Sequence, residues 1–360
     1  MKNIQLTCAH AIVKFLTKQK IYINGKKEPL FPGAFGIFGH GNVACLGQAL
    51  EENKKELPTW RGHHEQNMAL TGIAFSRAKR RKQIFIATSS VGPGSTNMLT
   101  AAAVAMSNRL PMLFLPGDTF ANRMPDPVLQ QVEHFNNPNI TQNDAFKYVT
   151  RYFDRITRPE QIIQSLPQAI QTMIDPADCG PACISLSQDV QGEVFDYPEE
   201  FFKEQIHTIR RSRPDDFQIK QAADLIKKSK NPIIISGGGI FYSDATKELS
   251  EFAKKHNIPT AQTVMGYSTM KKDDPYFLGA IGGFGGKEPN NFMKKTDLAI
   301  AIGTKLADFT TGSWTNFENP NFKLVSINVS RFDANKHMAQ SIIGDAKVCL
   351  QDLTLALGNW

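Results

Sequence analysis

The sequence predicts an α/β protein with two doubly wound domains, each built on a parallel sheet. Short apolar runs typical of strands alternate with helical patterns along the whole chain. The runs at 83–88 and 111–115 are almost continuously apolar, as in strands that are covered on both faces. A charged stretch with two prolines, 196–216, interrupts this alternation once. At roughly 150 residues per domain, a chain of 360 residues also favours two domains.

The first domain is expected to span residues 1–195 and to begin with a helix. Apolar residues recur at helical spacing from Ile4 to Leu16, and Thr7 offers an N-cap. The strands that follow are expected at 36–38, 83–88, 111–115 and 182–186, with helices near 42–50, 65–80, 96–107 and 159–173.

Residues 196–216 are expected to form a linker, because they are charged and show no strand periodicity. The second domain would then occupy 217–360. Its expected strands lie at 232–236, 299–302 and 324–329, and its helices at 218–228, 245–256 and 346–357.

Composition excludes several classes of protein. Hydrophobic residues make up 41% of the chain, which is enough apolar surface to exclude disorder as the dominant state. No apolar run approaches the roughly 18 residues of a spanning helix, so no membrane partner is expected. The net charge is +7, but its densest run, 77–82, ends a predicted helix and lacks interleaved aromatics, which argues against nucleic acid. Five scattered cysteines are typical of reduced thiols in a cytoplasmic protein.

The first candidate motif is the segment 35–42, which holds Phe38, His40 and three glycines. It follows a predicted strand and precedes a predicted helix. Ligands of open α/β sheets bind beyond the carboxyl ends of strands, and glycine allows close backbone approach there. An ordinary strand-to-helix turn is the alternative interpretation.

The second motif, 62–66, contains His63, His64 and Glu65. Adjacent residues of a helix do not face each other, and the zinc spacing of two histidines four apart is absent, so no metal site is expected. Glu65 opens a long amphipathic helix, and a carboxylate stabilised by the helix dipole is the simpler interpretation.

The third motif is Gly92-Pro93-Gly94-Ser95-Thr96-Asn97, between a buried strand and a helix rich in alanine. Its spacing is neither that of a P-loop nor that of the dinucleotide fingerprint.

Taken in this order, and followed by Leu113-Phe114-Leu115-Pro116-Gly117-Asp118, the three motifs resemble the pyrimidine-binding domain of thiamine diphosphate enzymes of the acetolactate synthase type. His64-Glu65-Gln66 is similar to the catalytic Glu motif of that family, and the Gly-Pro-Gly-Ser-Thr-Asn run to its Gly-Pro-Gly-Ala-Thr-Asn turn. The whole chain is more similar still to a branch that hydrolyses a carbon–carbon bond of a cyclic diketone in myo-inositol catabolism.

The resemblance implies a role for each candidate residue. Glu65 would be catalytic and would hydrogen-bond the pyrimidine ring of thiamine diphosphate, favouring the imino tautomer that deprotonates the thiazolium carbon. Phe38, Pro93 and Asn97 would contact the cofactor.

Substrate contacts are expected at His40, His64 and Asp118, partly because this chain departs from the synthases there. Asp118 stands where synthases carry Gln, and Phe38-Gly39-His40 replaces their Pro-Gly-Gly. These departures fit a substrate other than that of the synthases. The resemblance to the hydrolase branch implies a cyclic diketone, opened to a deoxy-glucuronic acid. Acetolactate synthase or pyruvate oxidase chemistry, or a non-catalytic remnant of the family, are the alternatives.

The diphosphate domain of the family is expected to be absent, because the sequence contains no Gly-Asp-Gly. The resemblance implies that this motif and a following Asn hold Mg²⁺ and the diphosphate. Both would therefore be held by a separate chain that carries the diphosphate domain, and this chain alone is expected to be inactive. A homo-oligomer is also expected.

A partial dinucleotide pattern begins at Gly237 and Gly239, with Tyr242 in place of the last glycine. It resembles the central domain of the same family, which binds FAD in some members. A partial match favours a structural role over FAD binding.

Overall fold

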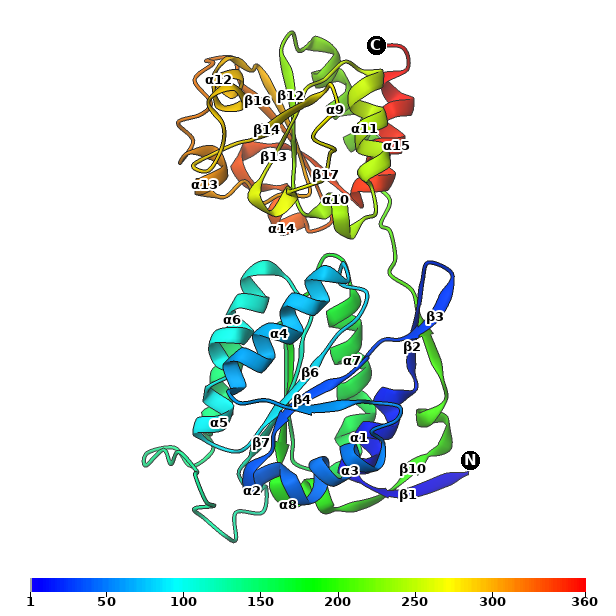
Figure 1. Cartoon of the computed structure of the whole chain (residues 1–360), viewed down its shortest axis with the longest axis vertical. Coiled ribbons are helices and arrows are strands. Elements are labelled where there is room, and N and C mark those ends of the chain that lie inside the picture. Colours follow the sequence, from blue (N-terminus) through cyan, green and yellow to red (C-terminus); the bar gives the residue numbers. More distant parts are fainter. Residues whose placement is uncertain (1) are drawn as a thin grey trace. The chain divides into compact units, whose positions relative to one another are not determined.

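The computed structural model describes residues 2–360, which divide into two compact units (Figure 1). The first extends to Ile209 and the second runs from Arg210 to Trp360. Each unit holds one six-stranded parallel sheet with helices on both faces, which confirms the predicted fold class.

The sheet of the first unit has the strand order β5-β4-β6-β7-β9-β8. Its strands are β4 (Ala34–Ile37), β5 (Thr59–Arg61), β6 (Ile86–Ser89), β7 (Leu113–Asp118), β8 (Tyr152–Ile156) and β9 (Ala182–Ser187). From β4 the chain moves outward to β5 and then returns to β6 on the other side of β4. The strand order therefore reverses between β4 and β6, and such a switch point leaves a crevice at the carboxyl ends of the strands.

Helices cover both faces of this sheet: α4 and α6 lie on one face, and α1 and α7 on the other (Figure 1). The helices are α1 (Cys8–Thr17), α2 (Gly39–Asn42), α3 (Gln48–Glu52), α4 (Glu65–Ala78), α5 (Pro93–Thr96), α6 (Leu99–Asn108), α7 (Ile162–Ile174) and α8 (Gln188–Gly192), with a π-helical turn η1 (Val43–Gly47) and 3₁₀ turns η2 (Gln142–Tyr148), η3 (Pro159–Gln161) and η4 (Glu199–Phe202).

The N-terminal helix begins where its predicted cap lies, since the Thr7 hydroxyl accepts a hydrogen bond from the His10 N–H at 3.3 Å. Ile4 is not part of it, because β1 (Asn3–Thr7) precedes the helix and pairs with β10 (Val194–Pro198). The helices expected at 42–50 and 96–107 are each divided: the first into α2, η1 and α3, the second into α5 and α6.

In the second unit the strand order is β14-β13-β12-β15-β16-β17. The strands are β12 (Pro232–Ser236), β13 (Thr260–Gln262), β14 (Phe277–Ala280), β15 (Leu298–Ile302), β16 (Lys323–Asn328) and β17 (Gln340–Ile343); the helices are α9 (Asp216–Lys228), α10 (Gly239–Tyr242), α11 (Thr246–Lys255), α12 (Lys287–Lys295), α13 (Asp308–Thr311), α14 (Arg331–Ala334) and α15 (Ala346–Leu357), with 3₁₀ turns η5 (Val264–Gly266) and η6 (Lys336–Met338).

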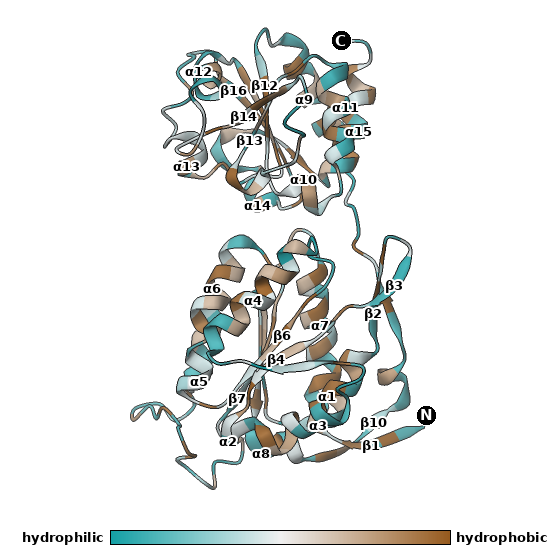
Figure 2. Ribbon diagram, in the orientation of Figure 1, coloured by the Kyte–Doolittle hydropathy of each residue, from teal (hydrophilic) through white to brown (hydrophobic). Residues whose placement is uncertain are grey.

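Strand alternation divides the core of this unit into two layers. Ile234 points to the layer that packs on α9, α11 and α15, whereas Ile233 and Ile235 point to the opposite layer. Both layers are apolar, which explains why these strands read as continuous hydrophobic runs (Figure 2).

The stretch that was expected to be a linker, 196–216, is structured over much of its length. It contains the end of β10, the turn η4 and β11 (Gln205–His207), all in the first unit. Tyr197 is fully buried, and its hydroxyl donates to the Pro159 carbonyl at 3.1 Å. Because the residues around Tyr197 are charged, the sequence does not reveal its burial. The boundary between the units falls after Ile209.

A three-stranded sheet of order β11-β2-β3, formed with β2 (Gln19–Ile23) and β3 (Lys26–Pro29), completes the first unit. Within residues 2–360, no helix is long and apolar enough to cross a lipid bilayer.

Candidate active site

Three of the predicted motifs lie at the switch point between β4 and β6. The turn after β4 carries Phe38 and His40, α4 begins at Glu65, and α5 follows β6. Two glycines permit the close approach of these turns. Gly39 has a φ of +52°, and a Cβ there would lie 2.5 Å from Ser90 Oγ. Gly92 has a φ of +69°, and its Cβ would lie 1.9 Å from the Gln130 carbonyl oxygen. A larger residue at either position would push the turns apart.

Glu65 is the first residue of α4 and its side chain is half-buried. Its Oε2 accepts a hydrogen bond from Asn97 Nδ2 at 3.0 Å, and its Oε1 lies beside Gly94, 3.4 Å from where a Cβ would stand. The acid is therefore held against the Gly-Pro-Gly turn. This arrangement brings together Glu65 and Asn97, two of the residues predicted to contact the cofactor.

His40 lies in a second cluster, around Gln130. Its Nε2 is 3.1 Å from Gln130 Oε1, and Ser90 Oγ donates to the same oxygen at 3.4 Å. The backbone carbonyl of Gln130 also approaches Gly92. The segment around Gln130 therefore bridges the turns that follow β4 and β6. Sequence reasoning missed Gln130, because no local pattern marks it and its contacts form only when the chain folds.

The other candidates differ in exposure. His64 is the exposed N-cap residue of α4, and its side chain makes no capping hydrogen bond. Pro93 is exposed at the first position of α5, and Phe38 packs partly buried against the core of the first unit. These positions leave His64 and Pro93 accessible to a ligand.

Asp118 is fully buried at the end of β7. Its Oδ2 accepts from Arg155 Nε at 2.8 Å, Ser185 Oγ at 2.6 Å and Thr141 Oγ1 at 3.1 Å, while its Oδ1 accepts from the Thr119 N–H at 2.8 Å. The carboxylate is thus engaged by protein donors. The substrate contact predicted for Asp118 has no support in this geometry.

Metal ligands are not gathered anywhere in residues 2–360: no group of three or more His, Cys, Asp or Glu side chains could hold an ion there.

The glycine-rich turn after β12 makes a tight internal contact. The Gly239 N–H donates to the Gly303 carbonyl at 3.0 Å, and a Cβ on Gly237 would lie 2.4 Å from the same oxygen. The close approach of two backbone segments accounts for these glycines.

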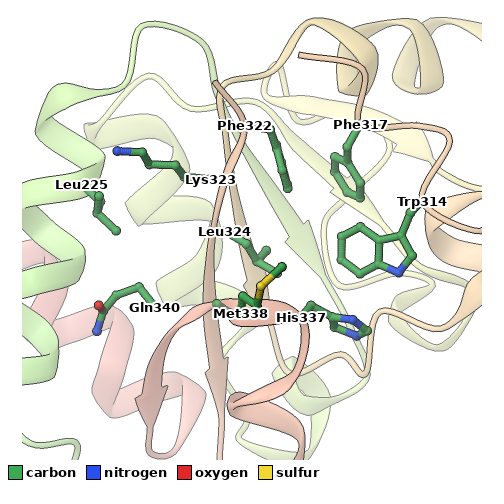
Figure 3. Close-up of a pocket in the computed structure, with 10 residues that line it drawn as sticks. Leu225, Trp314, Phe317, Phe322, Lys323, Leu324, His337, Met338 and Gln340 are labelled. Carbon is green, nitrogen blue, oxygen red and sulfur yellow. The ribbon is translucent and has the colours of Figure 1, made fainter. Parts of the chain in front are cut away.

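A pocket of about 730 Å³ lies in the second unit, between the start of β16 and the residues before β17 (Figure 3). Along one side, Trp314 has its ring centroid 5.2 Å from that of Phe317 and 4.5 Å from that of His337. The pocket is lined by Leu225, Trp314, Phe317, Phe322, Lys323, Leu324, His337, Met338, Ala339 and Gln340. None of these residues belongs to the cluster around Glu65.

Two family models match the chain, one in each unit. Residues 32–138 match the thiamine pyrophosphate enzyme N-terminal TPP binding domain, and residues 219–353 match the thiamine pyrophosphate enzyme central domain. The chain belongs to the thiamine pyrophosphate enzyme family.

Three curated relatives share the name 3D-(3,5/4)-trihydroxycyclohexane-1,2-dione hydrolase. The proteins from Clostridium tetani and Clostridium perfringens are each 48% identical to this chain, over 353 and 354 residues, and one from Clostridium botulinum is 47% identical over 353. Each alignment covers 98% of this chain and 55% of the relative. The chain thus spans little more than half the length of these relatives.

Proposed function

We propose that this chain forms the pyrimidine-binding and central parts of a thiamine diphosphate-dependent hydrolase of carbon–carbon bonds. Its substrate would be trihydroxycyclohexane-1,2-dione, which it would open to 5-deoxy-glucuronic acid in myo-inositol catabolism. The observation that carries the proposal is the Glu65–Asn97 pair, held at the switch point beside Gly94. Similarity over 98% of the chain to relatives of that name supports the choice of substrate.

The residues around Glu65 fit the aminopyrimidine end of the cofactor. A carboxyl group at a helix start, with one oxygen held by an amide, suits a hydrogen bond to a ring nitrogen. Gly94 leaves room beside the other carboxylate oxygen. When bound, thiamine diphosphate supplies a nucleophilic carbon that also accepts electrons from the substrate.

The protein groups have separate tasks in this proposal. Glu65 holds or releases a proton at the pyrimidine nitrogen, and Asn97 keeps its carboxylate turned toward Gly94. Phe38 and Pro93 would border the ring. His40 and His64 are the proposed substrate contacts, since one lies in the turn after β4 and the other directly precedes Glu65.

Diphosphate and Mg²⁺ would be held outside these 360 residues, by a segment equivalent to the part of the relatives that this chain does not match. Oxygen ligands are what Mg²⁺ prefers, and the described residues hold no cluster built to supply them. We also propose that the protein works as a homo-oligomer. We propose a cytoplasmic setting, which agrees with five free cysteines.

A fusion protein would test the proposal. This chain would be joined to the remaining C-terminal segment of the Clostridium tetani relative, so that both halves are present. We expect the fusion to bind thiamine diphosphate with Mg²⁺ in calorimetry and to consume the cyclic dione, whereas this chain alone binds weakly and is inactive.

Other outcomes separate the alternatives. Consumption of pyruvate instead of the dione would indicate acetolactate synthase or pyruvate oxidase chemistry. A folded fusion that binds the cofactor without either activity would identify a non-catalytic member. Tight binding of the cofactor by this chain alone would refute the proposed division of the site.

A further inference from the structure

We propose that Asn143 is a positioning residue for the candidate active site. It connects α5, the turn that presents Pro93 and precedes Asn97, to the buried ion pair of Asp118 and Arg155. The inference rests on the proposed function for the role of α5. The connection itself is a property of the fold and can be tested without the cofactor.

The orientation of the Asn143 amide is determined by its neighbours. Asn143 is fully buried, and its Nδ2 donates to the Gly117 carbonyl at 3.0 Å and to Ser185 Oγ at 2.8 Å. Because a carbonyl oxygen can only accept, the nitrogen must face Gly117. The Asn143 Oδ1 therefore faces Ser95, whose hydroxyl donates to it.

The hydrogen bonds keep the same donor-to-acceptor order as far as Asp118. Ser185 accepts from Asn143, so its own proton is directed to Asp118 Oδ2, 2.6 Å away. Arg155 donates to this oxygen at 2.8 Å, and its Nη2 reaches Asp144 Oδ2 at 2.9 Å. A chain of hydrogen bonds thus runs from Ser95 through Asn143 and Ser185 to a buried carboxylate, and each donor points toward that charge.

Helix α5 needs such an anchor because it is only four residues long. An isolated single turn is not stable in water, since its nucleation costs more than its hydrogen bonds return. Its backbone bonds include Thr96 N–H to the Gly92 carbonyl at 3.0 Å and Asn97 N–H to the Pro93 carbonyl at 3.1 Å. Ser95 is the fully buried residue of this turn, so its hydroxyl links the turn to the interior.

Loosening the hydrogen bond between Ser95 and Asn143 would affect the Glu65 carboxylate through Asn97. Asn97 follows Ser95 by two residues, and its side-chain amide holds Glu65 Oε2 at 3.0 Å. A turn that opens more often would release that amide. Asp118 would therefore influence the site through Ser185, Asn143 and Ser95, without touching the substrate.

The test compares Ser95→Ala with Ser236→Ala in the full chain. Ser236 is also fully buried, and its hydroxyl lies 2.7 Å from Thr269 Oγ1 and 3.2 Å from the Ala261 carbonyl oxygen, so its replacement removes a buried hydrogen-bonding hydroxyl from the second unit. Amide exchange of Thr96 and Asn97, followed by NMR, reports the opening of α5. We expect about fivefold faster exchange in Ser95→Ala only, the factor expected for losing one hydrogen bond.

Asn143→Ala should produce a larger effect in the same direction, but it also removes two bonds to the interior and risks unfolding. Ser95→Ala therefore decides the question. Unchanged exchange at Thr96 and Asn97 in Ser95→Ala would overturn the proposed link.

A thiamine titration gives the second readout, monitored by the side-chain amide resonance of Asn97. We expect thiamine to bind Ser95→Ala about fivefold more weakly than the wild type, and Ser236→Ala to match the wild type. Faster exchange with unchanged thiamine affinity would refute the positioning role. Faster exchange in a protein whose wild type does not respond to thiamine would leave the link standing but remove its positioning role. The proposed function is contradicted separately, if the fusion protein fails to bind thiamine diphosphate with Mg²⁺.

Discussion

The carboxylate of Glu65 accepts a hydrogen bond from the side-chain amide of Asn97 at 3.0 Å, across 32 positions of sequence. Glu65 begins α4, and Asn97 directly follows α5. Two helix termini therefore meet at one side-chain contact beside Gly94.

Replacing Glu65 with Gln should remove the acid while leaving its shape and its bond with Asn97 largely intact. In the fusion protein described above, we expect turnover of the cyclic dione to fall about 10²- to 10⁴-fold, the usual contribution of an acid–base group. Glu251→Gln on α11, a change at an exposed glutamate, is the control and should keep full turnover. Normal activity in Glu65→Gln would rule out proton transfer by this residue.

Arg155→Gln should destabilise the first unit strongly, because it leaves the Asp118 carboxylate buried without its cation. Breaking one partner of a buried pair costs about 3–5 kcal/mol. Urea unfolding measures this loss in the free energy of unfolding. Lys247→Gln, which breaks the exposed pair with Glu251, should leave the unfolding midpoint unchanged. Equal effects of the two substitutions would contradict a buried role for the Asp118–Arg155 pair.

His207 should make folding stability depend on pH. Burial lowers the pKa of His207, whose Nε2 lies 2.9 Å from Gln19 Oε1 between β11 and β2. A histidine with a depressed folded pKa binds its proton more readily when unfolded, so stability is retained above the unfolded pKa of about 6.5 and declines as pH falls below it.

We therefore expect His207→Gln to show a shallower decline of stability than the wild type between pH 7 and pH 5, measured by urea unfolding at each pH. Burial also lowers the pKa of His256, so part of the pH dependence of stability should remain in His207→Gln. The exposed residue His134 provides the control, and His134→Gln should keep the wild-type slope. If stability depends on pH in His207→Gln as it does in the wild type, His207 does not contribute to that dependence.

Gly92→Ala should be costly, whereas Gly192→Ala should be tolerated. A Cβ at Gly92 would lie 1.9 Å from the Gln130 carbonyl, and the backbone there has a φ of +69°. We expect a loss of about 1–3 kcal/mol in unfolding free energy from strain and steric overlap. At Gly192, in α8, a Cβ would meet Cys45 Sγ at an ordinary 3.5 Å. Thermal unfolding of both variants measures the difference in stability. A Gly92→Ala variant as stable as the wild type would show that the Gln130 carbonyl does not lie beside Gly92.

Local patterns in the sequence predict the parts of the fold that local physics determines. The strands β6 and β7 are buried on both faces, and their apolar runs reveal them within a few residues. Thr7 caps α1 and Glu65 begins α4, as side-chain chemistry and helical periodicity indicate. Tertiary contact is not needed to predict these features.

Elements that depend on distant partners could not be predicted in this way. The pairing of Asn3 with Pro198 in β1 and β10 has no local signal, and the charged residues around Tyr197 conceal its burial. Asn143 is an unremarkable polar residue until folding brings it beside Ser95 and Ser185. The motif containing Asp118 was recognised, but only its contact with Arg155 reveals that the carboxylate faces inward.

The antiparallel ribbon of β1 and β10 ties the first strand of the chain to a strand that lies shortly before the boundary between the units, since Asn3 pairs with Pro198 and Thr7 with Val194. Trimming the first seven residues would therefore strip β10 of its partner and expose a free sheet edge to aggregation.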